Sequence, residues 1–500
     1  MTYRKIGQAM TWNFLARIAR FMAGPVSYII VVRALGSYNW GILSVLKTIA
    51  GFALIIVMLG AGQALLKYIP VIRVRGGMHD FFRNIKRIFL LQVCAWVVVM
   101  IAAWAARHAI SDFYGVTTDG FSLYLVVAIG LVIFKVGISM ISNILQSWYE
   151  TKALSIVTII GNVAYLVIMM VLLKAGMGVI GYLVAGALID IGMTAALIPQ
   201  TLELVKKSPR EGEKSPDLPQ MIRFSLPFIV TGFLNQIVWR HSEVLFLGKW
   251  TGMEASGYFG LAYDIPQMAL EFVPLTIWPI VMAGTSEMFS KDAGRLPEAV
   301  DLYFRLLFIL VIPVAAMGFA FSRAMVPVLF GAEMLPAALL TQLFFVVFSY
   351  SFLYTPMSMA LYVMEKSWVN MLVLTLMAAI NVGLDVALIP RYGIWGAFAP
   401  IVIVLAIEVV VFEWAVRHFR KDVKIPYRFI ARCYLAALPA ACLAITANIW
   451  DSPAALAVQM AAGLALLVAG FRFMKILGER EKGLIMKLPI PFKEKIVAIL

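Results

Sequence analysis

Long apolar runs separated by short polar connections repeat along the whole chain. A window of about 19 residues finds fourteen runs that can cross a bilayer, which takes about 20 helical residues at about 1.5 Å each. Their approximate limits are 6–32, 41–66, 88–106, 121–145, 154–173, 178–198, 222–247, 256–284, 302–329, 336–363, 368–389, 394–416, 428–449 and 454–476. The pattern therefore predicts an all-α polytopic membrane protein with about 14 transmembrane helices.

The first run carries two arginines, Arg17 and Arg20, inside an otherwise apolar segment. A guanidinium near the bilayer midplane adds at least about 2.5–3.5 kcal/mol to the cost of insertion. Because the two are spaced i, i+3, they share one side of a helix. We expect that side to place positive charge in the polar interior of a helix bundle. The alternative is a pair of salt bridges to acids such as Asp264 that fasten the two halves of the chain together.

Composition supports a membrane protein without a soluble domain. Apolar residues make up 62% of the chain and charged residues 14%, and the mean hydropathy is +0.91, whereas soluble proteins have about 45–50% apolar residues. The longest polar stretch, residues 199–220, is rich in Pro, Lys, Glu and Ser and reads as a linker. The three cysteines show neither metal-ligand nor disulfide spacing. We expect no metal and no cofactor other than a coupling proton or sodium ion.

The net charge of +15 is unevenly distributed among the connections. Of the 42 Lys and Arg residues, 31 fall in or next to the two termini and alternate connections, 6 in or next to the opposite connections and 5 deeper inside the runs. The positive-inside rule then places both termini in the cytoplasm. The excess charge forms a collar suited to anionic lipid headgroups, so we expect no nucleic-acid partner.

The two halves of the chain resemble one another at an offset of about 215 residues. Runs one to six and seven to twelve read as two copies of a six-helix unit in the same orientation, with two helices appended, and related by an axis along the membrane normal. The matching pairs are Glu150 and Glu365, Gly178 and Gly393, Gly181 and Gly396, Asn162 and Asn381, and Leu35-Gly36 and Leu247-Gly248.

Three motifs carry a family resemblance: RALGSYNWG after the first run, LGKWTGMEASGYFGLAY after the seventh and YGIWGA before the twelfth. With the repeat and the span count, they resemble polysaccharide flippases of the multidrug/oligosaccharidyl-lipid/polysaccharide exporter superfamily over essentially the whole chain. The resemblance implies two six-helix lobes, alternating access, and export of undecaprenyl-diphosphate-linked sugar repeat units for O-antigen or exopolysaccharide. It also implies a polysaccharide polymerase complex as a partner and a bacterial inner-membrane location. The family's turn has Pro-Glu after Leu-Gly, whereas this chain has Ser37-Tyr38.

Alternatives within the superfamily are a lipid II flippase, which shares the fourteen-span plan, and a multidrug antiporter, which usually has twelve spans. A membrane enzyme acting on the same lipids is disfavoured. The outer connections are short, and no phosphate-binding loop or catalytic set stands out. We therefore expect a transporter and not an enzyme.

The repeat and the polar stretch define the predicted domains. Residues 1–199 form the N-terminal lobe, 200–220 the cytoplasmic linker and 221–420 the C-terminal lobe. Residues 421–476 hold the last two helices, and 477–500 form a basic amphipathic tail on the cytoplasmic leaflet.

Ionisable residues inside the runs are the candidate site residues. For the diphosphate and sugar headgroup we expect Arg17 and Arg20, whose guanidinium forks match phosphate oxygens, together with Arg240, Lys135 and Lys47. Arg240 alternatively pairs with Glu243 at i, i+3, and Lys47 alternatively extends toward the periplasmic interface. The candidates for ion coupling are Asp264, Glu271, Asp190 and Glu243, whose alternative role is to neutralise buried cations.

Overall fold

Helices are the only regular secondary structure wherever the structure of the chain is described. The computed structural model describes residues 3–75, 78–116, 120–148, 150–206, 217–239, 242–445 and 453–478, without the side chains of some residues in these ranges, and contains no strand there. Eleven helical segments of this part are long and apolar enough to cross a membrane. The first of them, Phe21–Met58, includes parts of two predicted runs. The expected all-α polytopic membrane fold is confirmed.

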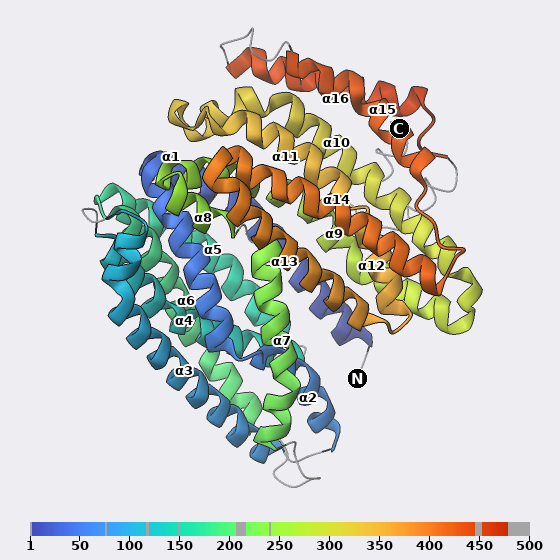
Figure 1. Ribbon diagram of the computed structural model, residues 1–500. Helices are drawn as coiled ribbons and strands as arrows, with labels where there is room; N and C mark the ends of the chain where they lie inside the picture. The colour runs from blue at the N-terminus through green and yellow to red at the C-terminus, as the bar shows by residue number, and fades with distance from the viewer. Residues whose placement is uncertain are drawn as a thin grey trace. The chain divides into compact units, whose positions relative to one another are not determined.

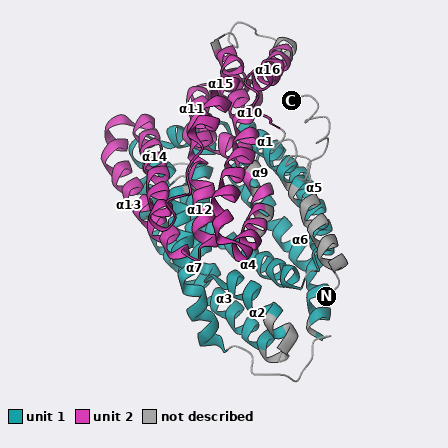
Figure 2. Ribbon diagram, turned by 90° about the vertical axis from the view of Figure 1, so that its right-hand side faces the viewer, with its two compact units in different colours: residues 1–257 teal, residues 258–500 magenta. Residues whose placement is uncertain are grey.

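The helices group into two compact units, residues 1–257 and 258–500 (Figure 2). Unit 1 contains α1 (Tyr3–Met58), α2 (Ala61–Arg75), α3 (Met78–Phe113), α4 (Phe121–Ser147), α5 (Thr151–Lys174), α6 (Gly178–Lys206), α7 (Leu218–Trp239), α8 (Glu243–Trp250) and the start of α9 (Met253–Lys291). Unit 2 contains the rest of α9, η1 (Ala293–Arg295), α10 (Leu296–Phe330), η2 (Ala332–Met334), α11 (Ala337–Ser351), α12 (Tyr354–Val363), α13 (Ser367–Tyr392), α14 (Ile394–Phe419), α15 (Tyr427–Ala441), η3 (Cys442–Ile445) and α16 (Pro453–Phe473).

The contacts assign α7 and α8 to unit 1, whereas the repeat assigns them to the second copy. Helix α7 packs on α1, α2 and α3, and α8 packs on α1. The appended pair α15 and α16 packs on α10 within unit 2 (Figure 1). The lobe limits drawn from the repeat remain a prediction.

A glycine divides α1 at the turn expected after the first apolar run. Gly36 has φ 72° and ψ 177°, outside the helical region, in a part of φ/ψ space that glycine enters without a steric penalty. On its far side Asn39 donates its side-chain amide to the carbonyl of Leu35 at 3.1 Å. The helices on the two sides of this kink supply most of the first and second predicted spans.

Two of the matched glycine pairs have similar structural surroundings. Gly178 is the first residue of α6 and Gly393 immediately precedes α14, with φ of 51° and 56°. Three residues later, a Cβ on Gly181 would lie 3.3 Å from Cβ of Leu172 in α5, and a Cβ on Gly396 would lie 2.6 Å from the carbonyl carbon of Leu388 in α13. Each glycine pair therefore permits a tight hairpin between the fifth and sixth helices of its copy.

Large apolar side chains cover the outer faces of many helices. Val98 and Ile101 of α3 are 66% and 64% exposed, Val410 of α14 is 67% exposed, and Val458 of α16 is 70% exposed. Contiguous apolar surface of this extent is not left in water by soluble monomers. These faces are suited to lipid, and the chain is a multi-pass membrane protein.

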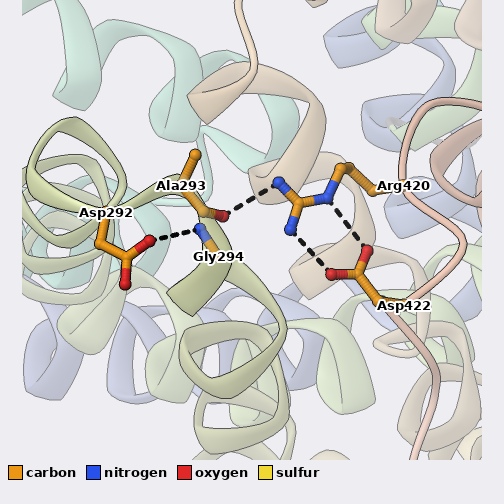
Figure 3. A network of polar contacts seen from close by, with 5 residues as sticks. All are labelled: Asp292, Ala293, Gly294, Arg420 and Asp422. Atoms are coloured by element: carbon orange, nitrogen blue, oxygen red, sulfur yellow. Dashed lines mark hydrogen bonds and ion pairs between the residues drawn. The ribbon is translucent and has the colours of Figure 1, made fainter.

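One arginine links two connections that are far apart in sequence (Figure 3). Arg420, after α14, donates from Nη1 to the carbonyl of Ala293 at 2.9 Å, and from Nε and Nη2 to the two carboxylate oxygens of Asp422 at 3.0 and 2.7 Å. The hydrogen bond from Arg420 lowers the pKa of Asp422 below its ordinary value, so the pair stays charged at neutral pH. The α9–α10 and α14–α15 connections therefore lie at the same end of unit 2.

Candidate functional site

Four helices of unit 1 enclose a cavity of about 930 Å³. Its lining comes from the second half of α1 and from α4, α5 and α6, together with Ala16 near the start of α1. Along α4 the lining runs from Ala128 to Gln146, roughly 27 Å at 1.5 Å per residue, close to the ~30 Å of a bilayer's hydrocarbon core. The volume is near the top of the ~300–1,000 Å³ range of small-molecule sites.

Three ionisable side chains line this cavity: Lys47 of α1, Lys135 of α4 and Asp190 of α6. Lys135 lies near the middle of α4 and exerts an electrostatic attraction on Asp190, without a hydrogen bond or close ion pair between them in the described structure. The Nζ of Lys47 lies 5.1 Å from the ring centroid of Trp40, one to two turns nearer the Gly36 kink. Lys47 therefore both lines the cavity and reaches toward the end of its helix that is predicted to be periplasmic.

Uncharged polar side chains also line the cavity. Tyr165 of α5 and Tyr182 of α6 meet edge to face, with ring centroids 6.4 Å apart, and both line the cavity. Ser155, 1% exposed, and Asn162 line it as well, and Ser155 Oγ and Asn162 Nδ2 have no hydrogen-bond partner among the described residues. Buried polar groups are usually paired, so these two atoms are available to a ligand or to water.

The polar residues that line the cavity recur at helical spacing along α4 and α5. On α4 the polar residues at 135, 139, 142, 143 and 146 recur at intervals of three and four, and on α5 those at 155, 158, 162 and 165 do the same. Such positions share one helix face. Of this set, only Lys135 stands out by its charge; a search for polar stripes within the apolar runs also finds the uncharged members.

The structure brings three of the predicted site residues together in one cavity, namely Lys47, Lys135 and Asp190. The side chains of Arg17 and Arg20 lie outside the described part of the structure, as does all of Arg240. Their roles remain predictions.

The other predicted acids lie elsewhere. Glu243, at the start of α8 in unit 1, is 1% exposed. Asp264 and Glu271 belong to α9 in unit 2, where the Gln267 amide donates to Glu271 at 2.8 Å. Interactions involve each of these three acids, so a structural role is compatible with every one of them.

Unit 2 holds a second buried polar group that sequence reasoning did not select as a site. Glu408 of α14 is 2% exposed, and its Oε2 has no hydrogen-bond partner in the described structure. Tyr354 of α12 interacts electrostatically with Glu408, Glu271 and Tyr303. On α13, the Asn381 amide donates to buried Asp385 at 3.2 Å. These carboxyl groups are carried within apolar helices, where an unpaired charge would be strongly disfavoured.

Comparisons with known proteins agree with this architecture. A family model described as "Polysaccharide biosynthesis protein" matches residues 6–283, more than half of the chain. An uncharacterized membrane protein of Methanocaldococcus jannaschii is 21% identical over 418 residues, which cover 79% of this chain and 81% of that protein.

Two solved transporters share the fold. The lipid II flippase MurJ, in an inward closed conformation, aligns with a TM-score of 0.73 at 13% identity, covering 93% of this chain and 99% of its own. An inward-facing multidrug resistance MATE family transporter of the MOP superfamily aligns with a TM-score of 0.63 at 15% identity, covering 83% and 98%. At these identities the similarity is one of fold.

Proposed function

We propose a transport function from one premise, that the chain belongs to the polysaccharide biosynthesis protein family. The protein moves undecaprenyl-diphosphate-linked oligosaccharide repeat units from the cytoplasmic to the periplasmic leaflet by alternating access of two helical lobes. The observation that supports this most directly is the polar cavity of about 930 Å³ inside a bundle of apolar helices. A hydroxyl-rich headgroup needs such a path, since hydrocarbon offers it no hydrogen bonds.

The cations act on the charged part of the substrate. A diphosphate carries at least two negative charges, and its unaided transfer into hydrocarbon would cost on the order of tens of kcal/mol. Arg17, Arg20 and Arg240, with Lys135 and Lys47, supply the opposite charge at membrane depth, and the polyprenyl tail stays in lipid. A guanidinium donates two parallel hydrogen bonds to phosphate oxygens.

The family description favours polysaccharide building blocks over lipid II or drugs as substrate, because the likeness to MurJ and to the multidrug transporter is of fold alone. Asp190, Glu243, Asp264 and Glu271 are the candidates for coupling transport to a proton or sodium gradient. The protein acts in the bacterial inner membrane with both termini in the cytoplasm. Anionic lipids bind its basic connections, and a polysaccharide polymerase complex receives its product.

Removing one arginine of α1 tests this function in cells. We expect Arg20→Ala to reduce surface polysaccharide at least tenfold, because the diphosphate loses a bidentate partner, while Arg20→Lys retains part of the activity. The readout is polysaccharide per cell, with protein level measured by immunoblot. The matched control is Arg391→Ala, at the exposed end of α13. Normal output from Arg20→Ala at normal protein level would refute the proposed role.

A further inference from the structure

Among the side chains that the structure describes, the lining of the unit 1 cavity sets an acid against a cation, an arrangement that suits a hydroxyl-rich ligand better than a diphosphate. Lys135 is countered by Asp190, which lines the same space. Lys47 directs its ammonium over the Trp40 ring at 5.1 Å, where the ring's π face attracts it. A diphosphate in this space would lie near the Asp190 carboxylate, and like charges repel strongly where water is scarce.

The same lining matches the hydrogen-bonding pattern of carbohydrate. A hydroxyl both donates and accepts, so one sugar can donate to Asp190 and accept from Lys135. Asn162 Nδ2 and Ser155 Oγ have no partner in the described structure, and both belong to residues that line the cavity. The amide offers donors, and the hydroxyl offers a donor and acceptors.

Aromatic and spatial features agree with this assignment. Tyr165 and Tyr182 present rings and hydroxyls at one end of the lining, and an aromatic ring with a polar handle suits a ligand that has both C–H and O–H faces. The lining extends roughly 27 Å along α4, from Ala128 to Gln146, which fits an extended oligosaccharide and not one monosaccharide.

We infer that this cavity is the sugar subsite of the transporter and that the diphosphate is held outside it, next to the first part of α1. Ala16 lines the cavity, and Arg17 and Arg20 come one and four residues after it in the sequence. This inference rests on the proposed function for the identity of the substrate. It reassigns Lys135 and Asp190 from diphosphate binding and ion coupling to the recognition of sugar hydroxyls.

Two probes that each contain half of the headgroup separate the subsites. The first is the oligosaccharide mixture released by mild acid from the polyprenyl-linked lipids of the source cells, and the second is undecaprenyl diphosphate without sugar. Binding of each to the full-length protein in lipid nanodiscs is measured for wild type, Asn162→Leu and Asp190→Asn. The control is Asn235→Leu, which removes an exposed amide of α7 that donates to its own helix.

We expect both cavity variants to weaken binding of the free oligosaccharide at least fivefold and to leave binding of undecaprenyl diphosphate within twofold. The control should leave both unchanged. An equal loss for the two probes would overturn the inference, as would free-oligosaccharide binding that the cavity variants leave unaltered or that wild type lacks at millimolar concentration.

A labelling experiment avoids dependence on how the variants fold. Ser142→Cys places a thiol in the cavity lining, in a background without the three native cysteines. We expect the free oligosaccharide to slow its reaction with a water-soluble maleimide at least fivefold and undecaprenyl diphosphate to leave the rate unchanged. Protection by undecaprenyl diphosphate alone would contradict the inference. If the sugar protects but the protein fails to move the lipid-linked form between leaflets, the sugar subsite stands and the proposed transport function falls.

Discussion

Single residues set the distance between helices where α1, after its kink, crosses the start of α9. A Cβ on Gly41 would lie 2.5 Å from the carbonyl carbon of Met253, and one on Gly257 would overlap the carbonyl oxygen of Ser37. Real Cβ atoms do not approach backbone so closely, so both positions need glycine. Small residues allow the same close approach at helix crossings within membranes.

We predict that Gly41→Ala and Gly257→Ala lower stability by about 1–3 kcal/mol, the usual cost of overpacking, and reduce transport. Thermal unfolding of the purified protein in detergent measures the first effect. The control is Gly192→Ala on α6, where an added Cβ would meet nothing within 4 Å; it should be neutral or slightly stabilising. Equal melting temperatures for Gly41→Ala and Gly192→Ala would contradict this account of the crossing.

At the residue scale, the sequence identified charges better than it identified uncharged polar groups. Lys135 and Asp190 stood out because ionisable residues are rare within apolar runs. Tyr165 and Tyr182 did not, because tyrosine is common at many depths and only packing shows that α5 and α6 bring the two rings together. The unpartnered state of Asn162 likewise depends on its neighbours in space.

Contacts between connections show which of them lie on the same side of the membrane, independently of the distribution of Lys and Arg. In unit 2, Arg420 joins the α9–α10 and α14–α15 connections (Figure 3), both predicted to be cytoplasmic. In unit 1, Lys249 donates to the Phe113 carbonyl at 2.6 Å, which joins two connections predicted to be periplasmic. These contacts group the connections as the 31-to-6 division of Lys and Arg groups them, and they leave open which group faces the cytoplasm.

We predict that the two ends of α5 face opposite compartments. In intact cells, a thiol introduced as Lys174→Cys should react with a membrane-impermeant maleimide, and one introduced as Lys152→Cys should react only after the membrane is permeabilised. Full-length protein without its native cysteines serves as the background. The reverse labelling pattern would invert the predicted topology and with it the direction of transport.

Hydropathy predicted where the helices lie along the chain, but it did not predict which helices pack together. The turn at Leu35-Gly36 and the hairpins at Gly178 and Gly393 occur at connections between the predicted runs. The packing of α7 on α1 and α2 depends on side chains far apart in the sequence, such as Tyr68 and Phe224, and hydropathy along the chain contains no information on such contacts. The sequence thus predicts which segments are helices and leaves their partners to tertiary packing.

At the scale of the whole molecule, the protein combines apolar outer faces with a polar cavity inside unit 1. The outer faces of the helices are apolar, the basic residues gather in alternate connections, and the cavity of unit 1 has polar side chains in its lining along roughly 27 Å of α4. In the proposed mechanism the oligosaccharide crosses within the protein while its lipid tail remains in the bilayer.

The most direct test is movement of the substrate between leaflets of proteoliposomes that contain only this protein. Lipid-linked oligosaccharide placed in one leaflet is followed by its accessibility to an impermeant periodate reagent added on the opposite side. We expect transfer well above that of protein-free liposomes, slowed at least fivefold by Asn162→Leu and unaffected by Asn235→Leu. Transfer no faster than in protein-free liposomes, with the ionic gradients supplied, would refute the proposed transport function.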